Sequence, residues 1–190
     1  MRAFAALCFA ALLCACASTP KISATAPIPP AHDAWIVGGD GRAIGQARFL
    51  PAPHGVLIRL EFREHGLPPG WHAVHLHRTA DCTDFGAGFR AAGDHVGAHR
   101  GVAHGLLHPQ GPEAGDLTNI FAAPTGPFAA ELYSDRVVLG PEETDHRAPL
   151  LDADGSALIV HLGPDDQVTQ PIGNAGPRIG CAALKPSAGG

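Results

Sequence analysis

The spacing of apolar residues along the chain predicts a protein built mainly of β-strands. In the segment GVLIRLEFR (55–63), apolar side chains at positions 58, 60 and 62 alternate with charged side chains at 59, 61 and 63. This period of two is typical of a strand with one buried and one exposed face. The segments WHAVHLH (71–77), AAELYSDRVVL (129–139) and SALIVHL (156–162) are further strand candidates, and Asp40-Gly41 indicates a hairpin turn in an antiparallel sheet.

Two stretches interrupt these strands. Residues 78–127 are rich in Gly, Pro and His and show little periodicity, and a second irregular segment, 163–177, precedes RIGCAAL. A structureless loop as long as the first one is usually functional or disordered. No helix of convincing length and no internal repeat is evident in the sequence, so we expect an all-β sandwich or barrel with two long functional loops.

Composition adds a metal hypothesis. The 190 residues include 24 Gly, 18 Pro and few aromatic residues, which suits short strands joined by turns. The formal net charge of -5 argues against a nucleic-acid-binding protein, because such proteins need a basic surface. The chain has 12 histidines, and histidine is the commonest metal ligand in proteins.

The N-terminus has the features of an export signal. Arg2 precedes an apolar run, Ala3–Ala15, that is too short to span a bilayer. The run ends in Leu13-Cys14-Ala15-Cys16, which resembles the bacterial lipobox, where the chain is cut before a cysteine that carries diacylglycerol. The alternative is a plain signal peptide cleaved nearby, after ACA.

These features predict three segments. We expect a signal peptide over 1–15, a lipidated flexible tether over 16–33 that is rich in Pro, Ala, Ser and Thr, and a folded domain over 34–186. The mature protein would then be a lipoprotein anchored to a membrane in the periplasm or cell envelope. The sequence leaves the oligomeric state open between a monomer and a homodimer.

Cleavage before Cys16 leaves two unmodified cysteines, Cys82 and Cys181. In an oxidising compartment, a single long-range disulfide is the simplest use of the pair. Zinc ligation by both cysteines is the alternative, although neither lies in a Cys-x-x-Cys spacing.

Three histidines fall on predicted strands. Because side chains of a strand alternate between its faces, His75 and His77 share one face and lie about 7 Å apart, close enough to reach one metal ion. His161 lies within an apolar strand, where a histidine is either buried and hydrogen-bonded or a metal ligand. Taken alone, each of these histidines is weak evidence for a metal site.

The first long loop holds further candidates, each of which would ordinarily be a solvated loop residue. Imidazole combined with carboxylate suits zinc. The candidates are His95, His99, His104, His108, Glu113 and Asp116.

Several motifs together resemble the copper/zinc superoxide dismutases, in particular their exported bacterial branch. The matching segments are GWHAVHLH, AAGDH, HGLLHPQGPEAGDL, LLDADGSALIVHLGPDD and GNAGPRIGCA, and the resemblance covers residues 34 to 184. It implies an immunoglobulin-like Greek-key barrel or sandwich of about eight strands.

The resemblance also implies roles for individual residues. His75, His77 and His161 would bind copper, and His95 would bridge copper and zinc as an imidazolate. Asp165 would link ligands of the two metal ions, and Arg178 would be the guanidinium beside copper. His104 and Asp116 would bind zinc, and Cys82 and Cys181 would form the disulfide that ties the metal-binding loop to the barrel.

The sequence departs from the family pattern at the zinc site. Glu113 stands where the family has a histidine, three residues before the zinc-binding aspartate. The spacing from His95 to His104 is one residue longer than the family pattern, and Asp94 replaces a small residue before His95. We therefore expect zinc to be held by His95, His104, Asp116 and a fourth ligand, Glu113, with His99 and His108 as substitutes for that fourth place.

The implied reaction is the dismutation of superoxide by redox cycling of copper, because zinc does not change its oxidation state. Arg178 would attract the small anionic substrate. Two alternatives are a copper carrier on the same barrel, which would not need an anion guide, and a copper-only dismutase with a degenerate zinc site. A zinc hydrolase is disfavoured because the sequence lacks a His-Glu-x-x-His helix.

Overall fold

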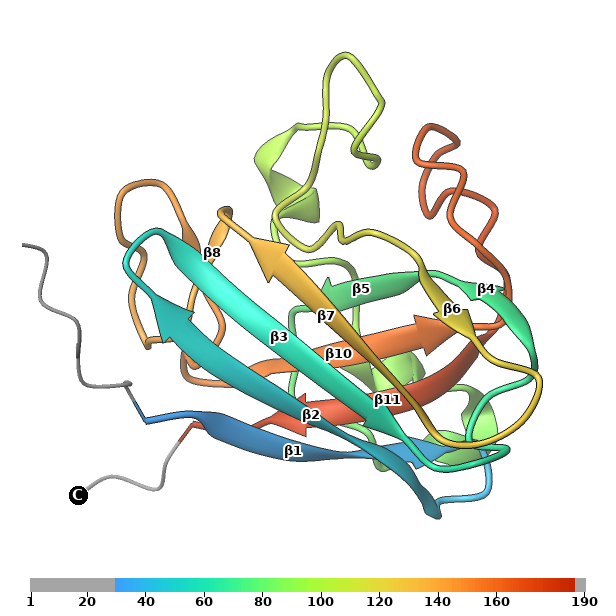
Figure 1. The fold of residues 1–190 in the computed structure, drawn as a ribbon. Coiled ribbons are helices and arrows are strands. Elements are labelled where there is room, and N and C mark those ends of the chain that lie inside the picture. Colours follow the sequence, from blue (N-terminus) through green and yellow to red (C-terminus); the bar gives the residue numbers. More distant parts are fainter. Residues whose placement is uncertain (1–29, 187–190) are drawn as a thin grey trace, which may run out of the picture.

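The computed structural model describes residues 30–186, and it is built of β-strands (Figure 1). The expected signal peptide, Cys16 and most of the expected tether lie outside the described residues. The strands are β1 (His32–Gly38), β2 (Ala43–Ala52), β3 (Gly55–Phe62), β4 (Gly70–His72), β5 (Val74–His77), β6 (Ile120–Ala122), β7 (Phe128–Ser134), β8 (Val137–Val138), β9 (Ala148–Pro149), β10 (Ser156–His161) and β11 (Arg178–Leu184).

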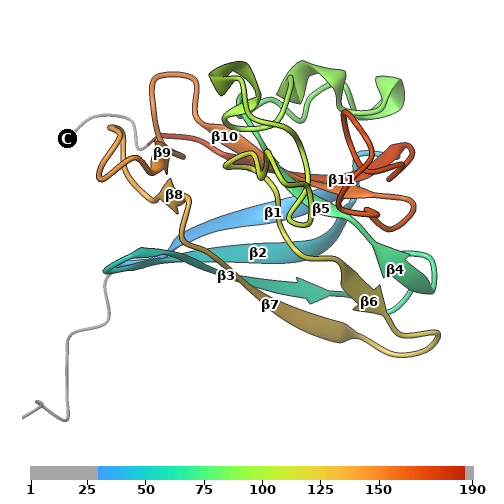
Figure 2. The ribbon, with the colours of Figure 1, turned by 90° about the horizontal axis from the view of Figure 1, so that it is seen from above.

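Seven strands form one curled antiparallel sheet in the order β5-β10-β11-β1-β2-β3-β7 (Figures 1 and 2). Two small pairs, β4 with β6 and β8 with β9, lie beside it. The expected hairpin joins β1 to β2, where Gly41 has a φ of 76°, a conformation that favours glycine. The all-β fold class is confirmed. Residues 30–186 contain eleven strands rather than the expected eight, because the small pairs add four strands of only two or three residues, among them the two-residue strands β8 and β9.

The curl of the sheet encloses the hydrophobic core. Ile58 and Leu60 are fully buried and Phe62 nearly so, whereas Arg59 and Glu61 on the same strand are exposed, as the alternation predicts. Apolar residues of other strands belong to the same core, among them Ile36, Phe49, Leu76, Leu158 and Leu184.

The strand expected over 71–77 is interrupted at Ala73. Its N–H bonds to the carbonyl of Gly163 and its carbonyl accepts from the N–H of His161. The chain therefore changes partners, from β6 along β4 to β10 along β5. At the N-terminal end, β1 begins at His32, inside the segment expected to be tether, because residues 32 and 33 pair with β2.

The two long loops lie over the outer face of the sheet at β5, β10 and β11 (Figure 2). Phe89 and Ala92 of the first loop pack there against Ala157, Ile159 and Cys181, which form a second apolar cluster outside the main core. Helical structure in residues 30–186 is limited to three 3-10 turns: Phe85–Ala87, Arg90–Ala92 and Ala98–Arg100. None of the described helices is long and apolar enough to cross a membrane.

Candidate metal centre

Three histidines are placed by neighbouring strands on the face covered by the loops. His75 and His77 lie on β5, and the register of β5 with β10 pairs His75 with Ile159. His161 ends β10. All three are at most 1 % exposed. The expected shared face of His75 and His77 is therefore present, and it faces away from the main core.

The first long loop adds two ligand candidates by pairing with the free edge of β5. His95 forms an isolated bridge with His77, and Asp116 forms one with His75. Leu76 donates its N–H to Gly115 and accepts from the N–H of Val96, both at 2.8 Å. A side chain at Gly115 would collide with the carbonyl oxygen of Leu76, so glycine permits this close approach.

Four ring nitrogens of the histidines placed by β5, β10 and the first long loop lie close together and have no hydrogen-bond partner within the described residues. They are His75 Nδ1, His77 Nε2, His95 Nε2 and His161 Nε2, all buried and without a hydrogen-bond partner in the part of the chain that the structure describes. Ligand atoms of these residues lie within 4.8 Å of one another, and we call the four residues the nitrogen group. Because buried polar atoms are normally paired, such a set indicates a metal-binding site.

The other nitrogen of each ring has a partner that orients it. His77 Nδ1 donates to the carbonyl of Gly93 at 2.8 Å, and His161 Nδ1 donates to that of Gly176 at 3.0 Å. His75 Nε2 lies 2.8 Å from Asp165 Oδ2. Such contacts are typical of metal ligands, because they fix the tautomer and leave the second nitrogen free for the ion. A set of imidazole nitrogens suits copper.

Burial keeps these rings neutral. It lowers the pKa of His75 to about 4 and that of His161 to about 3, and it holds the pKa of His77 well below its usual range. Neutral imidazole is the form that binds a metal ion. The strand histidines of the nitrogen group are therefore ready for a cation at neutral pH.

A second set combines nitrogen with oxygen and shares His95 with the first. His95, His104, Glu113 and Asp116, here called the mixed group, are all buried and also place ligand atoms within 4.8 Å of one another. His95 Nδ1 lies 2.8 Å from Glu113 Oε2 and 3.3 Å from Asp116 Oδ1. His104 Nδ1 lies 2.7 Å from Asp116 Oδ1 and 3.9 Å from Glu113 Oε2. This donor set suits zinc.

Opposite charges dominate the mixed group. Burial opposes the protonation of His104, but its hydrogen bonds with Asp116 and Asp165 outweigh burial and raise its pKa to about 10. Burial likewise opposes the charge of Asp116, yet His104 and His95 hold its pKa well below the usual range. A divalent cation would take the place of the protons that now neutralise these carboxylates.

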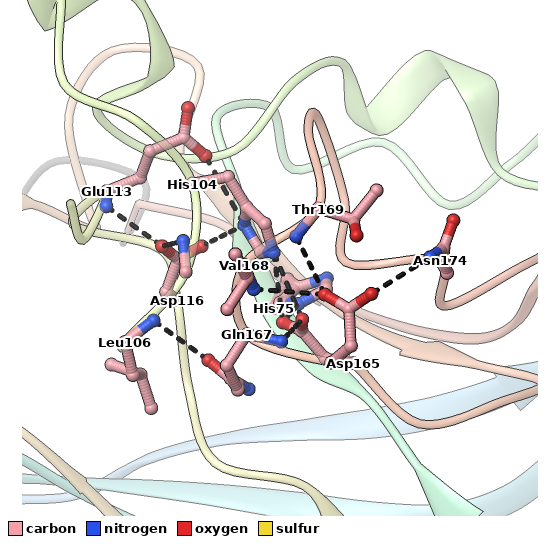
Figure 3. A network of polar contacts seen from close by, with 12 residues as sticks. His75, His104, Leu106, Glu113, Asp116, Asp165, Gln167, Val168, Thr169 and Asn174 are labelled. Atoms are coloured by element: carbon pink, nitrogen blue, oxygen red, sulfur yellow. Dashed lines mark hydrogen bonds and ion pairs between the residues drawn. The ribbon is translucent and has the colours of Figure 1, made fainter. Parts of the chain in front are cut away.

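Asp165 joins the two groups (Figure 3). Its carboxylate contacts His75 Nε2 at 2.8 Å and His104 Nε2 at 3.1 Å. Asn119 holds the backbone of Asp165 through both ends of its amide, at 2.8 and 2.9 Å. Gly173, with a φ of 60°, packs so closely that a side chain there would collide with this carboxylate.

Arg178 lies next to the nitrogen group. Its guanidinium donates to the carbonyls of Phe89 and Gly93 at 2.7 and 2.8 Å. Arg178 and His161 line one open cavity of about 530 Å³, so this cation and a buried ring of the nitrogen group lie at the same opening.

The expected disulfide between Cys82 and Cys181 is present, with a Cα–Cα distance of 5.8 Å. It fastens the start of the first long loop to β11. The alternative use of these cysteines as zinc ligands is therefore excluded.

The structure brings every residue that the resemblance implies as a ligand into one of the two groups, together with Glu113, the expected fourth zinc ligand. His99 and His108, the expected substitutes, belong to neither group of the described residues. His72 is buried and bonds to the carbonyls of His161 and Pro68, which is a structural role. Sequence reasoning missed Gly93 and Asn119, because a backbone carbonyl that accepts from side chains and an amide that holds a distant backbone leave no pattern in the sequence.

The fold and the site define a β-barrel-like metalloprotein in which a shared histidine joins an all-nitrogen metal site to a mixed one. Residues 43–184 match the profile of the copper/zinc superoxide dismutase family. A copper/zinc superoxide dismutase of Caulobacter vibrioides is 47% identical over 152 residues, which are 80% of this chain and 84% of that protein. Copper/zinc superoxide dismutase 2 of Aquifex aeolicus is 36% identical, over 80% of this chain and 85% of its own.

A solved structure gives the same result. The crystal structure of a superoxide dismutase-like protein from Bacillus subtilis is similar with a TM-score of 0.70 and 28% identity, covering 80% of this chain and 97% of that one. The chain belongs to the copper/zinc superoxide dismutase family.

Proposed function

We propose that the chain is a superoxide dismutase of the cell envelope, with copper held by the nitrogen group and zinc by the mixed group. The observation that carries this proposal is the convergence, within the described residues, of four buried and unpartnered ring nitrogens next to a cavity that Arg178 and His161 line. A copper carrier would need the nitrogens but has no use for a fixed cation next to them. The names of the relatives and the family support the enzyme.

The residues of the chain suit this reaction. Copper, when bound, supplies the one-electron couple by which two superoxide anions and two protons become dioxygen and hydrogen peroxide. Arg178 carries a permanent positive charge that attracts and orients the anion in the cavity. Electrostatic steering of the substrate is an established property of this enzyme class.

Proton transfer falls to His95. Its Nδ1 is held by Glu113 and Asp116, whereas its Nε2 faces the other rings of the nitrogen group. Nε2 is therefore the atom at which this ring can take up and return a proton while its position stays fixed from the other side.

The test is metal analysis and dismutase activity measured on the same sample. His161→Ala should lose copper and activity together, whereas His54→Ala, at an exposed position before β3, should keep both. If the copper-loaded wild-type protein shows no activity above that of free copper, the protein is a copper carrier and the proposal of an enzyme is wrong.

Glu113 is the proposed fourth zinc ligand. Its carboxylate is buried and directed at His95, and zinc accepts carboxylate oxygen at about 2.0–2.2 Å, close to its distance from imidazole nitrogen. Two carboxylates in place of one make this zinc site more anionic than the pattern with three histidines.

Export and anchoring rest on the sequence of the N-terminus. Diacylglycerol on Cys16 would follow from the lipobox-like Leu13-Cys14-Ala15-Cys16 after an apolar run, and a multiply acylated cysteine gives stable membrane binding. A disulfide is most common in proteins outside the cytosol, which supports the envelope location. Mass spectrometry of the native N-terminus decides: a mature chain that starts at Ala17 or later contradicts lipidation.

A further inference from the structure

His104 differs from the other histidines of the site in how its backbone is held. His75 and His77 belong to β5, His161 belongs to β10, and His95 is bridged to the edge of β5. His104 lies in the first long loop, outside any strand. Within residues 30–186, its backbone N–H and carbonyl bond only to the side chain of Gln170, in the second long loop.

The side chain of Gln170 forms two hydrogen bonds with the backbone of His104. Its Oε1 accepts the N–H of His104 at 3.0 Å, and its Nε2 donates to the carbonyl of His104 at 2.8 Å. The same Nε2 donates to the carbonyl of Val168 at 2.9 Å, which ties the amide to its own loop. Two opposed hydrogen bonds from one planar amide fix the position and the rotation of the peptide segment, as a neighbouring strand would.

Gln167 extends this contact along the first loop (Figure 3). Its Oε1 accepts the N–H of Leu106 at 3.0 Å and its carbonyl accepts that of Leu107 at 3.1 Å, while its Nε2 donates to the carbonyl of Leu117 at 3.1 Å. Gln167 is buried and has a φ of 64°, an uncommon value for a residue other than glycine. The surrounding contacts hold it in this conformation.

The ring of His104 depends on this support because it has little freedom to adjust. Its Nδ1 must meet Asp116 at 2.7 Å while its Nε2 meets Asp165 at 3.1 Å. A shift of the backbone by even an ångström would break one of these contacts. Removing the amide would also leave the N–H and carbonyl of His104 without their partners.

We propose that Gln170, assisted by Gln167, is a positioning residue that presets His104 for the second metal ion. The inference rests on the proposed zinc site, and it concerns residues outside the ligand sets. The second loop thus supports zinc binding twice, through the carboxylate of Asp165 on the ring and through the amide of Gln170 on the backbone. The backbones of the proposed copper ligands are held by strands and by the β5 edge, and the side chain of Gln170 hydrogen-bonds to none of them, so copper binding should be far less sensitive to Gln170.

The experiment compares metal affinities in the full chain. Gln170→Met keeps the length of the side chain but removes both hydrogen-bonding groups, and Gln170→Ala removes the side chain. The matched control is Gln110→Ala, because Gln110 lies in the first long loop and its exposed side chain makes no hydrogen bond within residues 30–186. Zinc and copper dissociation constants are measured separately by competition with chelators.

We expect both Gln170 variants to bind zinc about 10- to 100-fold more weakly, the range seen when the support of a metal ligand is removed. Copper affinity should change less than about threefold, and the control should match the wild type. The absorption bands of cobalt loaded into the zinc site report its ligand geometry, and they should shift or broaden in Gln170→Met even when cobalt is saturating.

Three results would overturn the inference. The first is unchanged zinc affinity and cobalt spectra in both variants. The second is an equal loss of zinc and copper with a lower melting temperature of the metal-free protein, which would show a merely structural role. In both cases an active, zinc-binding wild type leaves the proposed function intact. The third is a wild type that takes up no zinc, which overturns the zinc assignment together with the inference.

Discussion

His77 and Arg178 donate hydrogen bonds to the same carbonyl oxygen, that of Gly93, each at 2.8 Å. One peptide group of the first long loop therefore orients a proposed copper ligand and the cation that we propose attracts the substrate. The two side chains come from different strands, β5 and β11. Their relative position consequently depends on this loop as well as on the sheet.

Replacing Arg178 should slow the reaction without emptying the site. Arg178→Ala removes the positive charge from the cavity, so we expect kcat/KM to fall by about tenfold or more at low ionic strength. Because salt screens the attraction, the difference from wild type should narrow as ionic strength rises. Pulse radiolysis or a stopped-flow assay over a range of salt concentrations measures this, with copper content determined in parallel.

Arg42→Ala is the control for the loss of one positive charge, because Arg42 is exposed on the β1–β2 hairpin, where its contact is with Asp40. It should leave both rate and salt dependence close to wild type. Equal losses in the two variants would show that net charge, rather than the position of Arg178, governs the rate.

The disulfide should stabilise the domain and, through the loop, the site. Cys82 and Cys181 are 99 residues apart, and the cluster of Phe89 and Ala92 packs beside them. Replacing both cysteines with serine should lower the free energy of unfolding by about 2–5 kcal/mol in urea titrations. Activity should fall too, because the loop carbonyls of Phe89 and Gly93 hold Arg178. Full thiol labelling of active wild-type protein without reductant would contradict the bond.

The strands could be predicted from sequence because burial imposes a period of two. Ile58, Leu60 and Phe62 point inward as their alternation predicts. The break at Ala73 could not be predicted, because it depends on hydrogen bonds to Gly163 and His161, which are distant in sequence. The short strands β8 and β9 could not be predicted either, since two residues are too few to show a period.

The ligand residues of the site could be predicted from the sequence, but the contacts that orient them could not. The spacing of His75 and His77 and the family motifs indicated which residues to expect. They did not indicate that Nδ1 of His77 and Nδ1 of His161 donate to the backbone carbonyls of Gly93 and Gly176. Nor did they indicate that Gln170 hydrogen-bonds to the backbone of His104, because a contact between a side-chain amide and a backbone distant in sequence leaves no local sequence pattern.

The two groups should lose their metal ions at different pH values. The pKa of His104 is raised to about 10, so protons compete with zinc for this ring at every pH below that value. The pKa of His161 is lowered to about 3 by burial, so protons begin to compete with copper at this ring only in strong acid. Zinc should therefore leave at a higher pH than copper as the pH is lowered from 7.

Dialysis of the doubly loaded protein against buffers from pH 7 to pH 4, followed by elemental analysis, measures this order. Zinc affinity should weaken about tenfold for each unit of pH if one proton is displaced. Calorimetry in two buffers with different ionisation enthalpies counts the protons released. Loss of copper before zinc, or zinc binding without proton release, would contradict the assignment of His104 to the zinc site.

Glu113 offers the sharpest test of the zinc site, because it is the ligand position at which the chain departs from its family. Its Oε2 lies 2.8 Å from Nδ1 of His95 and 3.9 Å from Nδ1 of His104, so an ion held by these rings would meet the carboxylate. Glu113→Gln keeps the shape and removes the charge. Zinc should then bind at least tenfold more weakly, since a neutral amide is a poorer ligand than a carboxylate.

Two further variants separate ligation from general effects of charge. Glu142→Gln removes an exposed carboxylate outside both ligand groups and should leave zinc binding unchanged. Glu113→His restores the nitrogen that the family has at this position, and it should retain zinc better than Glu113→Gln although it too lacks the carboxylate.

Zinc content after loading with equal copper and zinc decides between the alternatives. Full retention in Glu113→Gln would point to His99 or His108 as the fourth ligand, and that loop would have to move, because neither ring lies in the mixed group. If neither the wild type nor the variants contain zinc, the protein is a copper-only dismutase. In that case the buried pairs of His95 with Glu113 and of His104 with Asp116 would serve to orient the rings rather than to bind an ion.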